Sequence, residues 1–192
     1  MDDKASAKLC EYHRGILPAR GLILDLMAAQ DSHLYPSSIA PQCLQVIGLG
    51  LAERTLKANP LLKSYLLHDL NVHPKLPFAD ACFDGIICTC GIEYLIQPQE
   101  LFAEVARVLK TGAPFMISFS ERYEVLKAIL IWRSGDEASH LRLVKHFFDN
   151  EPWLGPSQQK SFRPVEGDVL HCVWAYREKD PYHHDLHHQM SN

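Results

Sequence analysis

The chain has 192 residues, of which 47% are hydrophobic and 22% charged, a composition that suits one globular domain with a sizeable core. Its net charge of -4, from 19 basic and 23 acidic side chains, argues against nucleic-acid binding through bulk charge. No apolar run approaches the ~18 residues of a membrane-spanning helix. The polar start MDDKASAK lacks the pattern of a secretory signal, so we expect a cytoplasmic protein.

The first third of the chain alternates between helical and extended patterns. Apolar residues on one helical face mark the first element, and three apolar runs mark strands. Between the second and third runs lies a short helix that ends at Asn59-Pro60, because the residue before a proline avoids helical geometry. In chain order, the predicted elements are a helix at 4–14, strands at 21–27 and 44–49, a helix at 52–58 and a strand at 64–68.

The alternation continues through the rest of the chain. Residues 84–89 form an unbroken apolar run, as expected for a strand that is covered on both faces. Pro98 opens a helix with a regular apolar stripe, and Ser120 is predicted to cap another helix that reaches Trp132. The other predictions are a helix end near Lys110, a strand at 114–119, a helix at 138–149, a mobile loop at 151–164, an antiparallel strand near 161–166 and a final strand at 169–176.

This spacing predicts an α/β fold with a mainly parallel sheet and right-handed crossovers. Ligands of such sheets bind at the carboxyl ends of the strands. We expect one domain over residues 1–178, followed by a tail, 179–192, that is too polar to pack. The strand ends that should meet at the ligand edge are 25–32, 48–53, 69–71 and 89–94.

Two stretches carry a resemblance to a known family. The first is DLNVHPKLPFADACFDGIICTCGIEYL at 69–95, with an acid, a loop, Leu-Pro-Phe, a second acid, Phe-Asp and an apolar strand in order. The second, LFAEVARVLKTGAPFMISFS at 101–120, looks like the helix and strand that follow in that family. Together they resemble class I S-adenosylmethionine-dependent methyltransferases of the methyltransferase type 11 group. The resemblance implies a Rossmann-like sheet with an antiparallel last strand, S-adenosylmethionine (SAM) as cofactor and a small-molecule acceptor.

The resemblance assigns site residues unevenly. Asp25 matches the start of the family's first motif and Asp69 its adenine-side acid, but Met27 stands where a glycine is usual. Gly48 and Gly50 stand where the family usually has an acid for the ribose. The implied cofactor-binding residues are Asp25, Leu26, Met27, Ala28, Gly48, Leu49, Gly50, Asp69, Leu70, Asn71, Thr89 and Cys90.

These departures leave two functional hypotheses. Glycine leaves room for a ligand, so Met27 narrows the site, and a missing ribose acid removes hydrogen bonds worth about 1.5–3 kcal/mol each. The first hypothesis is a SAM-dependent methyltransferase of a divergent subfamily, with His33, Glu93 and Tyr94 as candidate catalytic residues. The second is a methyltransferase-like domain without catalysis that binds or regulates a partner, because Met27 fills the cofactor cavity.

Three further features allow more than one interpretation. GLGLAE at 48–53 has the outline of a dinucleotide fingerprint, but Glu53 replaces its third glycine, which makes nicotinamide or flavin binding a minor alternative. Only about twenty residues precede the first strand, so a homodimer could complete the lid of the site. No metal is expected, and a metal on the tail histidines is the weaker alternative to a solvated tail. Those histidines are His183, His184, His187 and His188.

Overall fold

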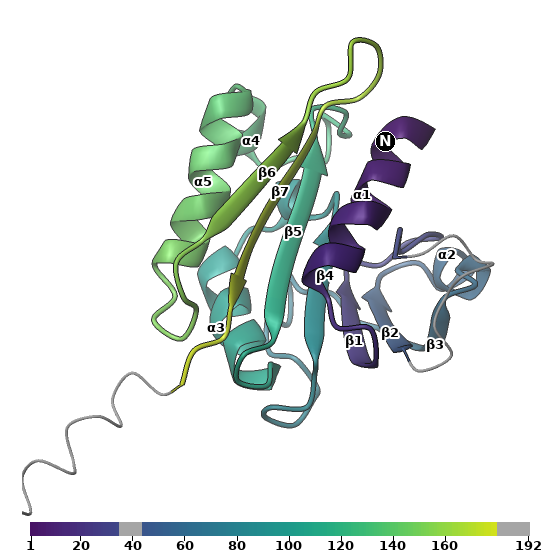
Figure 1. Cartoon of the computed structure of the whole chain (residues 1–192), viewed down its shortest axis with the longest axis vertical. Helices are drawn as coiled ribbons and strands as arrows, with labels where there is room; N and C mark the ends of the chain where they lie inside the picture. The colour runs from purple at the N-terminus through teal and green to yellow at the C-terminus, as the bar shows by residue number, and fades with distance from the viewer. Residues whose placement is uncertain (35–43, 180–192) are drawn as a thin grey trace, which may run out of the picture.

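The computed structural model describes residues 1–34 and 44–179. They form a seven-stranded sheet in the order β3-β2-β1-β4-β5-β7-β6 (Figure 1). β1 to β5 are parallel and β7 is antiparallel to both β5 and β6, so the predicted mainly parallel sheet with an antiparallel last strand is confirmed. The strands are β1 (Gly21–Leu26), β2 (Leu44–Gly50), β3 (Leu62–Leu67), β4 (Gly85–Thr89), β5 (Pro114–Ser120), β6 (Gln158–Phe162) and β7 (Leu170–Tyr176).

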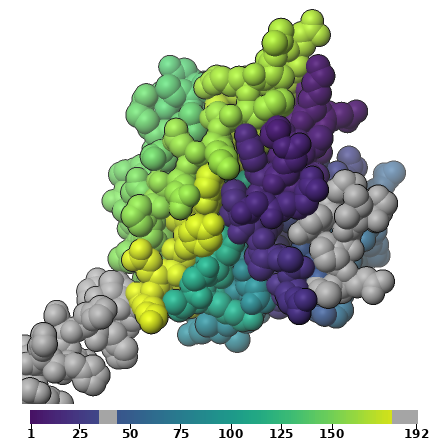
Figure 2. Space-filling model, viewed as in Figure 1, coloured from purple at the N-terminus to yellow at the C-terminus, as the bar shows by residue number. Residues whose placement is uncertain are grey.

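Helices cover both faces of the sheet (Figure 1). On one face α3, α4 and α5 pack on the sheet, with the ring centroids of Phe102, Phe115 and Phe148 5.0–5.1 Å apart. α1 lies across the other face over β5 and β7, where its purple surface is visible in Figure 2. The helices are α1 (Asp3–Ile16), α2 (Glu53–Ala58), α3 (Pro98–Val108), α4 (Leu130–Arg133) and α5 (Glu137–Asp149), with a 3-10 turn, η1 (Ile92–Tyr94).

Alternation along β7 explains how one strand serves two cores. Leu170, Cys172 and Trp174 face α1, whereas Val173 and Ala175 face the layer of α3 and α5. Successive side chains of a strand point to opposite faces, so a run that is apolar throughout must be covered twice. The unbroken apolar runs of β4 and β5 are buried for the same reason.

α1 is fixed to the sheet at its first turn. Asp2 caps the helix by accepting a hydrogen bond from Ala5 N at 2.9 Å. Asp2 and Asp168 also exchange backbone-to-carboxylate hydrogen bonds of 2.7 Å ahead of β7. Gly167, at φ 121°, leaves room for this pair, since a Cβ there would lie 2.5 Å from Asp2 Oδ2. The direction of α1 across the sheet is thereby set.

The structure corrects the helix predicted after β5. Ser120 is the last residue of β5 and caps no helix, and between β5 and α5 only the single turn α4, which includes Trp132 and Arg133, is helical. The apolar pattern misled because Leu126 and Leu130 are 90% and 75% exposed and do not face a core. Trp132 alone is buried in this segment's helical turn, stacked on His140 with ring centroids 4.1 Å apart.

Two further boundaries differ from the prediction. The predicted loop 151–164 contains β6, which pairs with β7 at 158–162 and not at 161–166. Four of its five side chains are polar and exposed, as an edge strand allows, and only Phe162 is apolar, so the strand carries little apolar signal. α3 ends at Val108, before Lys110, because Lys110 N turns away to donate to Phe83 O at 2.9 Å.

Candidate functional site

Two cavities open side by side at the carboxyl ends of β1 to β4. The β3-side cavity has a volume of about 230 Å³ and is lined by residues that follow β2, β3 and β4. The β1-side cavity has a volume of about 350 Å³ and lies along the loop after β1. Met27, Ala28 and Cys90 line both cavities, so these three residues form the partition between them. This is the edge at which α/β sheets bind ligands.

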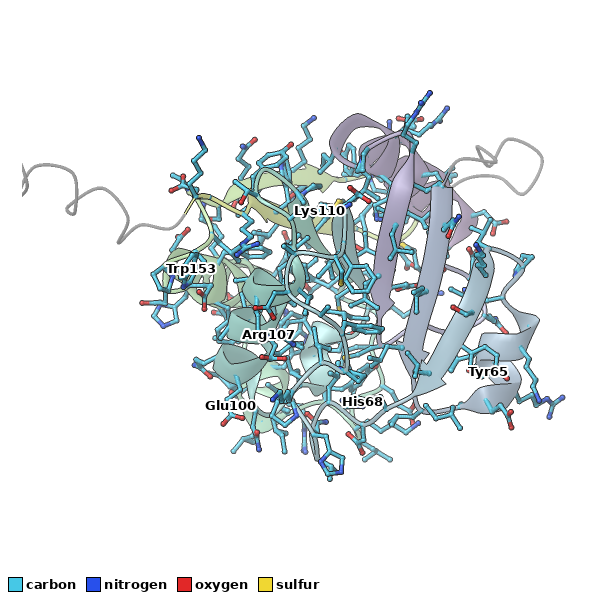
Figure 3. The ribbon with its side chains drawn as sticks, turned by 90° about the horizontal axis from the view of Figure 1, so that it is seen from below. Tyr65, His68, Glu100, Arg107, Lys110 and Trp153 are labelled. Atoms are coloured by element: carbon cyan, nitrogen blue, oxygen red, sulfur yellow. The ribbon has the colours of Figure 1, made fainter. Side chains whose placement is uncertain are left out.

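The residues after β3 shape the β3-side cavity. Asp69, Leu70 and Asn71 all line it, and His68 precedes them at the end of the sheet opposite Lys110 (Figure 3). Asn71 N donates to Asp69 Oδ1 at 2.9 Å. The Asn71 side chain bridges to the opposite wall, where Nδ2 donates to Tyr94 O and Oδ1 accepts from Ile96 N, both at 2.9 Å. These bonds fix the separation of the two walls.

The loop after β1 accommodates side chains where glycines are usual. Met27 has a φ of 54°, a left-handed conformation that costs a non-glycine residue roughly 1–2 kcal/mol. Ala28 N donates to Leu49 O at 2.8 Å, which draws the loop against β2. Gly50 provides the space for this approach, since a Cβ there would lie 2.6 Å from Ala28 O. The missing room in the loop is thus supplied by the neighbouring strand.

Asp25 is a buried carboxylate on the β1-side cavity. Its side chain is 2% exposed, and Oδ2 has no hydrogen-bond partner among residues 1–34 and 44–179. Burial raises the pKa of Asp25 to about 7, and the Ser32 hydroxyl opposes that rise. Asn59 Nδ2 holds Ser32 Oγ at 2.9 Å. A cationic ligand group would supply the partner that this carboxylate lacks.

The segment after β4 forms the wall that both cavities share. Cys90 has a φ of 50°, its N donates to Ser118 O at 2.8 Å, and burial raises the pKa of its thiol to about 11, so the thiol is neutral. Gly91 faces Met27, and a Cβ at Gly91 would lie 3.0 Å from Met27 Sδ. The Tyr94 hydroxyl accepts a hydrogen bond from Glu124 N at 2.9 Å.

Most predicted site residues lie on the cavity walls. Leu26 and Leu49 line neither cavity because both are fully buried in the core. Gly48 lines neither because it packs on Leu62, whose Cδ1 would lie 2.5 Å from a Cβ there. The residues on the walls are Asp25, Met27, Ala28, Gly50, Asp69, Leu70, Asn71, Thr89 and Cys90.

The catalytic candidates are separated by the structure. His33 lines the β1-side cavity and Tyr94 the β3-side cavity. Glu93 lines neither cavity; it is 1% exposed, and burial raises its pKa to about 7. Within the part of the chain that the structure describes, no cluster of three His, Cys, Asp or Glu residues could hold a metal ion. The histidines of the metal hypothesis, His183, His184, His187 and His188, lie outside that part.

Sequence reasoning did not single out several wall residues. Thr55, on α2, and His68, the residue before Asp69, line the β3-side cavity outside the predicted strand ends, whereas Leu51 lies within the predicted end 48–53. A position directly at the end of a parallel strand was the available signal for His68.

No helix in 1–34 or 44–179 has the length and apolar character needed to cross a bilayer.

Residues 24–117 match the sequence profile of the family described as "Methyltransferase domain". Over these residues, from β1 to β5, the chain resembles that family. The match begins on β1, ends on β5 and includes every strand whose carboxyl end contributes to the two cavities. The chain is also 30% identical over 117 residues to the biotin biosynthesis bifunctional protein BioHC of Teredinibacter turnerae. That alignment covers 60% of the chain but only 18% of the relative.

Solved structures share the fold at low identity. The chain superposes with a TM-score of 0.66 and 15% identity on a chain from the complex between the Haloferax volcanii Trm112 methyltransferase activator and a candidate methyltransferase. The superposition covers 94% of this chain and 93% of that one. For the geranyl diphosphate C-methyltransferase of Streptomyces coelicolor, solved with S-adenosyl-L-homocysteine, the TM-score is 0.59 at 15% identity, with 91% and 76% covered. A SAM-dependent methyltransferase of Aquifex aeolicus gives 0.59 at 20% identity, with 88% of each chain covered.

Proposed function

We propose that the protein is a SAM-dependent methyltransferase that acts on a small-molecule acceptor. The observation that carries this proposal is the pair of acids on either side of Met27. Asp25 lies in the β1-side cavity with an unpaired, buried carboxylate oxygen, and Asp69 lies in the β3-side cavity. SAM carries an ammonium group at one end and an adenine amine at the other, so the two acids match the two ends of one ligand.

The β3-side cavity fits an adenosyl group. Its walls include the apolar side chains of Leu51 and Leu70, which suit a flat base, and Asp69 is available at the rim to accept from an amine. Glu53, the first acid after β2, does not line the β3-side cavity, and it pairs with Lys57 at 2.9 Å and accepts from Tyr65 at 3.2 Å. We therefore expect weaker cofactor binding than a site with a ribose-binding acid would give, by about 1.5–3 kcal/mol per lost hydrogen bond.

When bound, SAM supplies an electrophilic methyl group. The protein's part is to hold the two ends of the cofactor and to place the acceptor in line with that group, and such positioning alone supplies a large share of the rate. The partition of Met27, Ala28 and Cys90 separates the cavity that Asp25 lines from the cavity that Asp69 lines. The reacting centre is therefore expected beside this partition.

Calorimetry with S-adenosyl-L-homocysteine (SAH) tests the proposal. We expect saturable binding at submillimolar SAH, together with thermal stabilisation of the protein by SAH and by SAM. Asp69→Ala should weaken SAH binding about tenfold or more through loss of a charge-assisted hydrogen bond. Glu100→Gln, an exposed change on α3, is the matched control and should bind SAH as the unmodified protein does. Absence of binding at millimolar SAH would refute the proposal.

Met27→Gly separates the two hypotheses for this domain. The change removes the side chain that divides the cavities, so SAH affinity should rise about fivefold if removing that side chain relieves roughly 1 kcal/mol of steric conflict with the bound ligand. The same titration on both proteins measures it. If only Met27→Gly binds SAH, the unmodified chain is a domain that Met27 has closed to the cofactor. If Met27→Gly binds less tightly, Met27 is a ligand contact and not an obstruction.

A further inference from the structure

His33 is held on the wall of the β1-side cavity by contacts to its ring. Its Nδ1 lies 2.7 Å from Ser6 Oγ, which comes from α1, and 3.3 Å from Asp31 Oδ2. The ring is largely buried, with 19% of the side chain exposed. His33 thus reaches the cavity from between a helix and a carboxylate that both approach the same ring nitrogen.

These contacts favour one tautomer of the ring. The negative charge of Asp31, 3.3 Å from Nδ1, favours a proton on that nitrogen, which then donates to Ser6 Oγ at 2.7 Å. A neutral imidazole with its proton on Nδ1 has its lone pair on Nε2. Burial lowers the pKa of His33, and Asp31 partly opposes that change, so the neutral ring prevails at pH 7. The result is a neutral histidine in a single tautomer, with Nε2 as the proton acceptor.

The backbone of His33 is fixed as firmly as its ring. Its φ of 50° is unusual for a residue with a side chain, and its N donates to Asp31 Oδ1 at 2.8 Å. Its carbonyl oxygen accepts from Nδ1 of His13 at 2.8 Å, and burial lowers the pKa of His13 to about 4, so that donor stays neutral. Ser6 and His13 are two helical turns apart and share one face of α1. One helix therefore positions both the ring and the backbone of His33.

The charge of the cavity restricts the acceptor. Its described wall includes Asp25 and Asp31 but no lysine or arginine side chain. Met1 also lines the cavity, and its amino group already pairs with Asp168 at 3.7 Å. The adjoining sequence 35–43, YPSSIAPQC, contains no lysine or arginine either. A carboxylate or phosphate acceptor would therefore meet two acids, and the one cationic group on the described wall is already paired. Like charges in a partly buried site disfavour binding. A neutral or cationic acceptor faces no such penalty.

Building on the proposed function, we propose that His33 is the catalytic general base for an amine or hydroxyl acceptor that carries no carboxylate or phosphate. The acceptor nitrogen or oxygen forms the new bond to the methyl carbon, and the carbon–sulfur bond breaks with its electron pair on sulfur. The proton displaced from the acceptor goes to His33 Nε2. Ser6 and Asp31 act as positioning residues, because they keep the proton on Nδ1 and stabilise the imidazolium that forms.

Methyl transfer from radiolabelled SAM to matched amines, alcohols and carboxylic acids of one carbon skeleton tests the acceptor class and the base together. We expect transfer to the amine or the alcohol and none to the acid. His33→Ala should lower kcat by about 10²–10⁴-fold, and added imidazole should restore part of the loss, which a merely structural residue would not allow. His146→Asn, on the exposed side of α5, is the control and should leave kcat unchanged.

Two further measurements separate this inference from the proposed function. The affinity of His33→Ala for SAH should stay within about threefold of that of the unmodified protein. If the unmodified protein does not bind SAH, the proposed function fails, and this result is distinct from a failure of the general-base role of His33. Ring ¹⁵N shifts should assign the proton to Nδ1 and give a pKa below 6.5, with Asp31, Asp25, His13 and the Met1 amino group as the titrating groups around it. Any of four results would overturn the assignment of His33 as the general base. They are methyl transfer to the carboxylic acid, no transfer to any acceptor by a protein that binds SAH, a ring proton found on Nε2, and a kcat of His33→Ala within threefold of that of the unmodified protein.

Discussion

Asp25→Asn is expected to stabilise the free protein at pH 8 by about 2–4 kcal/mol, because a pKa raised from 3.8 to about 7 sets an upper bound of about 4 kcal/mol, at about 1.4 kcal/mol for each tenfold change in proton affinity. Burial raises the pKa of Asp25 from 3.8 to about 7. The folded state therefore binds the proton more tightly than the unfolded state, so this contribution is fully present below pH 4 and is lost as the pH rises towards 7. Asparagine has no charge to bury.

Urea unfolding at pH 4.5, 6 and 8 measures this effect. The free energies of unfolding of Asp25→Asn and the unmodified protein should converge at the lowest pH and separate as the pH rises. Glu93, whose pKa burial also raises to about 7, contributes in the same window and remains in both proteins. The variant should also bind SAH about ten- to a hundredfold less tightly, since a charge-assisted hydrogen bond is lost. Equal stability of the two proteins at pH 8 would show that Asp25 is not a buried charge.

Arg107→Ala is expected to lower the free energy of unfolding by about 3 kcal/mol. The guanidinium ties the segment before β4 to α3, donating to Leu76 O at 3.0 Å and Phe78 O at 2.9 Å. It also pairs with Glu104 and Asp80 at 2.6 Å each. Truncation leaves two carbonyl groups without their donor, and Leu76 is 1% exposed, so water replaces that bond poorly.

Thermal unfolding measures this effect. Arg107→Ala should lower the Tm by roughly 6–12 °C, because a loss of about 3 kcal/mol lowers the Tm by about 2–4 °C per kcal/mol in a chain of this size. Arg107→Lys keeps the charge but not the fork geometry and should recover only part of the loss. Arg142→Ala, on the exposed side of α5, is the matched control with a change below about 0.5 kcal/mol. A Tm of Arg107→Ala within 2 °C of the control would contradict the anchoring role assigned to Arg107.

Much of the fold could be predicted because its central strands are buried on both faces. The apolar runs of β1, β4 and β5 and the stripe of α3 have a periodicity that only a covered sheet and a packed helix satisfy. β6 was misplaced because an exposed edge strand needs no apolar residues. The helix before Trp132 was wrong because the pattern cannot tell an apolar side chain in a core from one in solvent, as Leu126 illustrates.

The site could be predicted as far as topology fixes it. Asp69 and Asn71 follow a parallel strand, so the rule for strand ends placed them at the cavity. Contacts between distant segments gave no local signal. Ser6 reaches His33 across 27 positions, and Asn59 reaches Ala29 across 30, through backbone turns that no short pattern encodes.

The close approach of Ala28 to Gly50 makes two positions interdependent. A side chain at residue 50 would place its Cβ 2.6 Å from the carbonyl oxygen of Ala28 as long as the loop keeps its present course. A glycine at residue 27 alone would leave a void beside Gly91. Neither exchange is neutral by itself, so an arrangement with space at residue 50 and one with space at residue 27 are separated by an unfavourable intermediate. A lineage that has adopted one arrangement is therefore held to it, and a search for glycines in the first loop will overlook its members.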